Sequence, residues 1–164
     1  MNDNDVRIDN EDTMKDLYLI FTVNKRDYAL DVHYLIEIIA IQPLSEIDNM
    51  PEYVKGVINL RGKIIPIIDV RLRLKLPTKE YSEFTCVLIV KLGELFFGMV
   101  VDAVQELIHI PEENKEPTPT FLVTNKTWCI DYIGKLEKDI KMILNLDKFL
   151  HWNEVEKLQT TELV

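Results

Sequence analysis

The sequence has few of the residues on which common enzyme and nucleotide-binding motifs depend. It contains five glycines, three histidines and two serines in 164 residues. The glycines form neither Gly-x-Gly-x-x-Gly nor a phosphate loop, and neither serine stands in a Gly-x-Ser-x-Gly nucleophile motif. No two histidines follow the i, i+4 spacing of helical zinc ligands. These absences argue against an enzyme and predict that the chain holds neither a cofactor nor a metal ion.

Long apolar runs and an excess of basic residues are also missing. No stretch of about 18 residues is free of charge, so no membrane-spanning helix and no direct membrane insertion is expected. Residues 1–16 are acidic and polar, which is unlike a secretory signal peptide and predicts a cytoplasmic protein. The net charge is −9, with −4 in residues 1–16, −2 in 151–164 and −3 in 17–150. This acidic balance argues against a nucleic-acid partner.

The chain nevertheless has enough apolar residues for a real core. Hydrophobic residues make up 47% of the sequence, which excludes global disorder. Its two cysteines, Cys86 and Cys129, lie in apolar stretches without Cys-x-x-Cys spacing, so buried free thiols are expected. Residues 1–16 are expected to form a disordered acidic tail.

The residue pattern predicts a chain made mostly of strands. Leu17–Val23 is rich in β-branched and aromatic residues, and turn-forming residues separate it from a return strand at 28–30. Apolar residues at 32, 35, 36 and 39 then follow helical spacing, with Asp31 as the N-cap. Further strands are expected at 85–92, 95–101, 127–132 and 140–146.

The stretch 54–76 predicts a strand, a turn at 59–62 and a second strand, with Pro66 at an edge or bulge. Beyond that strand, basic residues alternate with leucines, which fits either a strand with one wet face or a short helical turn. The polar, proline-bearing segment 112–119 is expected to be a loop. A C-terminal helix is expected from about 147 to 158.

An internal repeat accompanies this pattern. When residues 17–41 are laid over 86–110 without a gap, six positions are identical, among them Glu37 and Glu106. A second offset lays 64–74 over 140–150. The repeat predicts two similar small β-units, and strands at this short spacing are typical of small barrels.

Arg61 stands out at the turn between two apolar strands. It is either a solvated hairpin arginine or a presented arginine that anchors a partner through forked hydrogen bonds. It also belongs to the only basic cluster of the chain, which is either a solvated face or the surface of a small barrel that binds RNA or another acidic ligand; the cluster comprises Arg61, Lys63, Arg71, Arg73 and Lys75.

Five runs of the sequence resemble the CheW family of bacterial chemotaxis coupling proteins: 18–21, 28–32, 36–38, 54–71 and 98–104. The run Gly-Val-Ile-Asn-Leu-Arg-Gly-Lys-Ile-Ile-Pro is long and specific, and the similarity covers about 14–150. The resemblance implies an all-β fold of two five-stranded SH3-like barrels packed on a shared apolar core, with short helices including a C-terminal helix. It implies a domain over 17–150, with the first barrel at about 17–65 plus a C-terminal return, the second at about 66–145, and the end of the helix and a tail at 151–164.

The resemblance also implies a function. CheW-like proteins are non-enzymatic scaffolds that couple the cytoplasmic tips of chemoreceptors to the regulatory domain of the histidine kinase CheA, in arrays beneath the inner membrane. The implied receptor groove lies between the barrels, lined by Leu19, Val32, Leu35 and Val104, with Glu37 and Arg61 as its polar positions. Each apolar member also fits an ordinary core position. The family's Glu-Ile-Arg-Gly-like segment reads Glu-Ile-Ile-Ala at 37–40, and no individual kinase-facing residue is identified.

Overall fold

The computed structural model describes residues 13–150, and these form strands joined by short helical turns. The strands are β1 (Leu17–Val23), β2 (Arg26–Asp31), β3 (Leu35–Ala40), β4 (Val54–Leu60), β5 (Lys63–Asp69), β6 (Cys86–Leu92), β7 (Leu95–Val101), β8 (Ala103–His109), β9 (Lys115–Pro117), β10 (Ile130–Leu136) and β11 (Asp139–Leu144). The helical turns are η1 (Val32–Tyr34), α2 (Val70–Arg73), η2 (Glu112–Asn114), η3 (Thr120–Leu122) and α3 (Leu146–Leu150).

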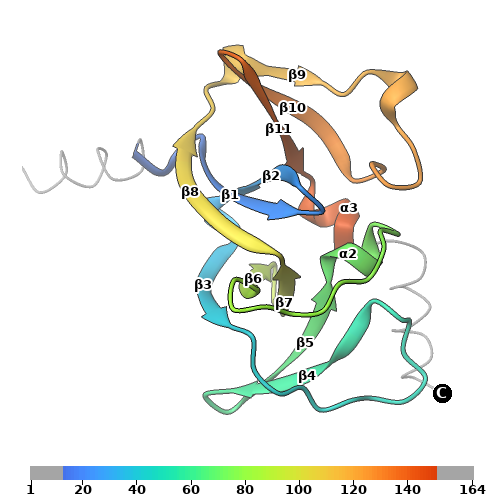
Figure 1. The fold of residues 1–164 in the computed structure, drawn as a ribbon. Coiled ribbons are helices and arrows are strands. Elements are labelled where there is room, and N and C mark those ends of the chain that lie inside the picture. The colour runs from blue at the N-terminus through green and yellow to red at the C-terminus, as the bar shows by residue number, and fades with distance from the viewer. Residues whose placement is uncertain (1–12, 151–164) are drawn as a thin grey trace, which may run out of the picture.

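The strands form two sheets, one above the other in Figure 1. Sheet 1 has the order β8-β1-β2-β11-β10-β9, and sheet 2 has the order β3-β6-β7-β5-β4. The sheets do not follow chain order, because β3 to β7 all belong to sheet 2 while β8 returns to sheet 1. The segment expected to form the first barrel, about 17–65, therefore contributes strands to both sheets.

The third strand of each repeat pairs with the other repeat. The β1–β2 hairpin leads into β3, which pairs with β6, whereas the β6–β7 hairpin leads into β8, which pairs with β1. The two registers are equivalent: Leu35 lies opposite Val90, and Val104 lies opposite Phe21. Each pair also stands beside a shift in register. The two units are thus interlocked, and neither sheet is complete without a strand from the other unit.

The second part of the repeat, in which residues 64–74 correspond to 140–150, also has equivalent strand pairings in the two sheets. β5 runs parallel to β7 with Ile67 opposite Gly98, and β11 runs parallel to β2 with Ile143 opposite Ala29. A short helix follows each of these strands, and the residue before it accepts a backbone hydrogen bond through its side chain, Asp69 before α2 and Asn145 before α3. The equivalent pairings confirm the internal repeat expected from the sequence.

Within residues 13–150, three apolar clusters make up the core. The largest takes side chains from both sheets and lies between them; it includes Phe21, Leu30, Leu88, Phe97 and Phe149. Each sheet also curls around a smaller cluster of its own. These clusters occupy matching repeat positions, such as Ile20 and Ile143 in sheet 1 and Ile89 and Ile67 in sheet 2. The all-β class with two barrels on a shared core is confirmed; β9 adds a sixth strand to sheet 1.

The helix expected from the apolar spacing after Asp31 is wrong beyond its first turn. Asp31 does cap a helical turn, since its carboxylate accepts a hydrogen bond from the His33 backbone at 2.9 Å. That turn is only the three-residue η1, and the chain then extends as β3. β3 packs apolar residues on two sides, Leu35 against the central cluster and Ile39 against the cluster of sheet 2. Because apolar residues on both faces of β3 are in contact with a cluster, their spacing along the sequence matches the spacing expected for a helix.

The segment after β5, for which either a strand or a helical turn was expected, forms the helical turn α2. The loop expectation for 112–119 is wrong in part, because η2 and the short strand β9 lie within it. The C-terminal helix is present as α3, whose described residues end at Leu150. The remainder of that predicted helix, and most of the predicted tail at 1–16, lie outside the described residues.

Candidate functional site

The most prominent polar contact of the predicted site joins Glu37 and Arg61. Arg61 Nη2 donates to Glu37 Oε2 at 2.9 Å, and Nη1 donates to Oε1, so the pair is bidentate. The Arg61 side chain is 72% exposed and that of Glu37 is 23% exposed. The hydrogen bond from Arg61 lowers the pKa of Glu37. The structure thus brings together two residues that lie far apart in the sequence.

Local backbone geometry presents Arg61 at this place. Arg61 has φ 51°, in the left-handed region, and Gly62 after it has φ 88°. The Asn59 side chain accepts a hydrogen bond from the Gly62 backbone at 2.9 Å, which closes the turn between β4 and β5. A two-residue turn of this kind holds the arginine at the tip of a hairpin.

The ion pair also bridges the two edge strands of sheet 2. Glu37 lies on β3 and Arg61 follows β4, the first and last strands of that sheet. Apolar residues of both edges contribute to one cluster, and Ser45 forms a bridge with Val57. The edges of sheet 2 thus approach each other, and the Arg61–Glu37 pair spans their meeting point.

The apolar residues of the predicted groove differ in accessibility. Leu35 and Val104 are half-buried at equivalent positions of the edge strands β3 and β8, and both pack against the central cluster. Val32 is half-buried in η1. Leu19 is 3% exposed and lies inside the central cluster, so it supports its neighbours and offers no surface of its own. The accessible part of the predicted site is therefore Val32, Leu35 and Val104 with the ion pair.

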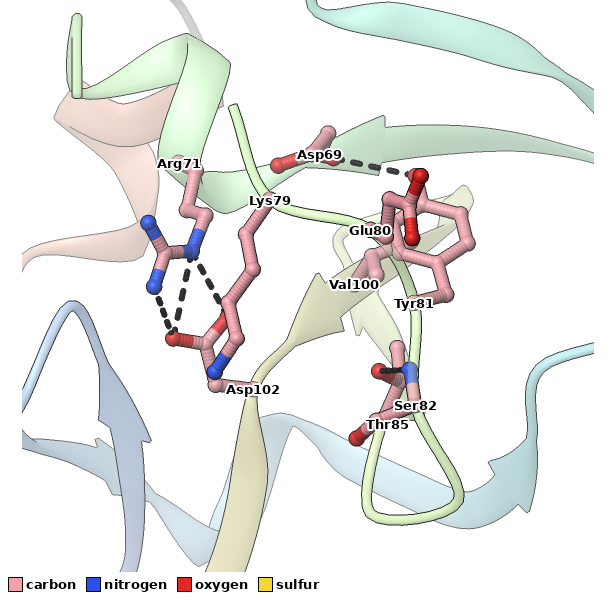
Figure 2. A pocket seen from close by; sticks show the side chains of 9 residues that line it. All are labelled: Asp69, Arg71, Lys79, Glu80, Tyr81, Ser82, Thr85, Val100 and Asp102. Carbon is pink, nitrogen blue, oxygen red and sulfur yellow. Dashed lines mark hydrogen bonds and ion pairs between the residues drawn. The ribbon is translucent and has the colours of Figure 1, made fainter. Parts of the chain in front are cut away.

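The basic cluster seen in the sequence is not one surface. Arg71 turns inward and donates to Asp102 through Nε at 2.9 Å and Nη2 at 2.6 Å, as Figure 2 shows. Arg73 is 2% exposed; its Nε donates to the Phe149 carbonyl at 2.9 Å. Of the five residues only Arg61, Lys63 and Lys75 are exposed. The structure removes two of the cations on which the RNA-binding alternative depends.

An exposed apolar patch around η3 was not identified from the sequence. Phe121 is 82% exposed, and Leu122 and Val123 beside it are also exposed. Phe121 and Leu122, together with Ile140 of β11, border a cavity of about 670 Å³ on sheet 1. Contiguous exposed apolar residues of this kind are typical of protein contacts. The only available signal in the sequence was the apolar triplet 121–123, which follows the prolines at 117 and 119 after one threonine.

Neither a metal-binding cluster nor a membrane-spanning helix is found within residues 13–150. No group of three metal-binding side chains occurs there, and no helix in that range is long and apolar enough to cross a membrane. Cys129 is a buried free thiol, as expected, and burial raises its pKa to about 12. Cys86 is free but only half-buried.

Comparison with known structures defines the class of the fold. The scaffolding protein TtCheW of Thermoanaerobacter tengcongensis superimposes with a TM-score of 0.78 and is 31% identical; the match covers 85% of this chain and 94% of that one. The chain is therefore a two-barrel protein of the SH3-like type.

Sequence comparison then gives the family. The CheW-like domain matches residues 17–154. The chemotaxis protein CheW of Klebsiella aerogenes is 33% identical over 144 residues, which are 88% of this chain and 87% of that protein. The CheW protein of Bacillus subtilis is 30% identical over 132 residues, 80% of this chain and 85% of that one. The chain belongs to the CheW family, and the resemblance inferred from its motifs is confirmed.

Proposed function

We propose that the protein is a non-enzymatic adaptor that couples the cytoplasmic tips of chemoreceptors to the histidine kinase CheA, in arrays beneath the inner membrane. Membership of the CheW family supports this role. The observation that carries the proposal is the bidentate Arg61–Glu37 pair on the edges of sheet 2. We take residues 17–150 as the domain that performs the coupling.

The receptor-facing surface combines apolar area with this ion pair. Leu35 and Val104 supply half-buried apolar contacts on the two edge strands that the repeats exchange. A helix of the receptor tip would bind there through apolar anchors, while the charged pair sets its register. Leu19 acts from beneath by holding the central cluster.

Coupling requires a second, separate surface for the kinase. The η3 patch around Phe121 lies against strands of sheet 1, whereas the ion pair joins the edges of sheet 2. We assign the η3 patch to the regulatory domain of CheA, because large exposed aromatic residues commonly anchor protein interfaces. A Phe121→Ala variant is expected to weaken kinase binding and leave receptor binding unchanged.

Titration of ¹⁵N-labelled protein with a receptor-tip fragment tests the receptor surface. NMR shift changes are expected to cluster around Leu35, Arg61 and Val104. Arg61→Glu is expected to weaken binding about tenfold or more and to shift the melting temperature by only a few degrees, because exposed substitutions change stability by less than about 0.5 kcal/mol. Lys138→Glu, the same charge change at an exposed position of sheet 1, is the control.

Two results would contradict the assignment. Shift changes confined to η3 and to strands β9, β10 and β11 would place the receptor elsewhere. Unfolding of Arg61→Glu, with recovery in the charge-swapped Glu37→Arg/Arg61→Glu double variant, would show that the pair serves the fold and not the partner.

A further inference from the structure

The end of sheet 2 that carries Arg61 also holds an aromatic ring with two ammonium groups over it. Lys63 Nζ lies 3.8 Å from the centroid of the Phe96 ring, and Lys91 Nζ lies 5.2 Å from it. Lys91 and Phe96 are direct partners in the β6–β7 hairpin, and Lys63 begins β5, which neighbours β7. Three cations, Arg61 included, thus gather at one end of this sheet.

The two lysines lack a counter-charge. Among residues 13–150, neither Lys63 nor Lys91 forms an ion pair with a carboxylate, although Glu94 stands in the same hairpin as Lys91. Glu37 is already engaged by both Nη atoms of Arg61. The face of a ring attracts each ammonium, but the two like charges repel each other. This end of sheet 2 is therefore locally positive on a chain of net charge −9.

The equivalent end of sheet 1 has the opposite character. The repeat offsets place Arg61, Lys63, Lys91 and Phe96 of sheet 2 on Glu137, Asp139, Thr22 and Asp27 of sheet 1. There a single lysine bridges two carboxylates, since Lys141 Nζ lies 2.6 Å from carboxylate oxygens of both Asp27 and Asp139. One end is thus closed by internal ion pairs, while the other leaves its cations open to a partner.

We propose that Lys63, Lys91 and Phe96 form a recognition site for an aspartate or glutamate side chain on an acidic segment of a protein partner, beside the Arg61–Glu37 pair. The proposal rests on the receptor-coupling function, and it adds the chemistry that the receptor tip must present there. Lysine ammoniums on flexible stems suit a carboxylate as point charges. The Phe96 ring beneath them offers apolar contact to the methylene groups of the same acid.

The charge balance of the rest of the domain supports the selection. Residues 17–150 carry a total charge of only −3, so an acidic segment meets a nearly balanced surface elsewhere and is attracted to this end, which directs its approach and orientation. A nucleic acid would also be attracted by cations, but Arg71 and Arg73 turn inward and leave no continuous basic track for a phosphate backbone.

Affinity measurements with a receptor-tip fragment test the site. At about 50 mM salt, Lys63→Gln/Lys91→Gln is expected to weaken binding about tenfold, and near 0.5 M salt the difference from wild type is expected to fall below about twofold. The control is Lys75→Gln/Lys138→Gln, which removes the same charge from two exposed positions that form no ion pair with a carboxylate of residues 13–150. It should bind like wild type.

The outcomes separate this proposal from the function on which it rests. If Arg61→Glu loses binding and Lys63→Gln/Lys91→Gln does not, the carboxylate site is wrong while receptor coupling stands. If wild type does not bind the fragment, receptor coupling fails and the site falls with it. A single-stranded RNA oligonucleotide that displaces the fragment and depends on both lysines would also overturn the proposal.

Carbodiimide cross-linking locates the contact directly. The reagent joins a lysine amine to a carboxylate as an amide, and water is taken up as the carbodiimide becomes its urea. Peptide mapping is expected to show Lys63 or Lys91 joined to an aspartate or glutamate of the fragment. Cross-links confined to other lysines, such as Lys25 or Lys79, would overturn the proposal.

Discussion

Replacement of Asp102 by alanine removes a carboxylate that holds three segments together. Asp102 lies between β7 and β8 and accepts from Arg71 of α2, through Nε at 2.9 Å and Nη2 at 2.6 Å. It also accepts from the Asn24 backbone in the β1–β2 turn at 2.9 Å. Because β1 and β2 belong to sheet 1 and α2 follows a strand of sheet 2, these contacts tie the two sheets together.

The stability that Asp102→Ala is expected to lose follows from the burial of the Arg71–Asp102 ion pair. The side chains of Arg71 and Asp102 are 11% and 19% exposed, so the pair is largely removed from water. Removing one partner of a buried ion pair costs about 3–5 kcal/mol, and the remaining exposure of Asp102 places the expected loss near the lower end, at about 3 kcal/mol. For a chain of this length, that corresponds to a fall in melting temperature of about 6–12 °C.

The stabilisation of the fold by Asp102 is expected to be lost as the pH falls. Burial raises the pKa of Asp102, but hydrogen bonds from Arg71 and the Asn24 backbone outweigh burial, and the net direction is downward. A carboxyl whose pKa is lower in the folded state stabilises the fold above its unfolded pKa, about 3.9, and loses this effect as pH falls through the folded value. The difference in the free energy of unfolding between wild type and Asp102→Ala should have its maximum value at pH 7 and should shrink below about pH 4.

Urea denaturation of wild type and Asp102→Ala at pH 7 measures the loss. Glu106→Ala, which removes an exposed carboxylate of β8, is the control and should stay within about 0.5 kcal/mol of wild type. An Asp102→Ala variant as stable as this control would refute the inter-sheet role of the pair.

Three further predictions concern packing and thiol chemistry. Gly98→Ala should lower stability by about 1–3 kcal/mol in urea denaturation, because the new Cβ would lie 2.6 Å from Ile67 Cδ1; unchanged stability would contradict the tight contact. Phe149→Ala should cost about 3–5 kcal/mol, since this ring is fully buried in the central cluster, and a loss below 1 kcal/mol would place the ring outside it. Cys129, whose pKa burial raises to about 12, should stay unreactive to Ellman's reagent at pH 8 until the chain unfolds, while half-buried Cys86 reacts first; the reverse order would be inconsistent with this core.

Much of the fold could be predicted because its strands carry local signals. β1 was predicted with its bounds, and β6 and β7 lie almost where their apolar runs indicated. The internal repeat is visible in sequence because equivalent positions bury similar side chains. The exchange of β3 and β8 between the units is not visible, because strand pairing depends on long-range contacts. The helix expected after Asp31 failed for the same reason: only the partner surfaces on both sides of β3 explain its spacing.

The site was predictable to a smaller extent. Arg61 was identified from its turn, and Glu37 was identified from the resemblance as a second polar position; their direct contact was not predicted. Leu19 could not be separated from groove residues, because apolar spacing does not distinguish the centre of a core from its rim. The inward turn of Arg71 depends on Asp102, a residue 31 positions away, and so could not be inferred locally. Phe121 lacked any periodic pattern that would mark it as exposed.

Co-sedimentation with receptor-containing membranes tests the central claim most directly. Chemoreceptor vesicles are mixed with CheA, with and without this protein, and the kinase in the pellet is quantified. We expect CheA to sediment with the vesicles when the wild-type protein is present, and much less with Arg61→Glu. Equal amounts of pelleted kinase with and without the protein would contradict its role as a coupling adaptor.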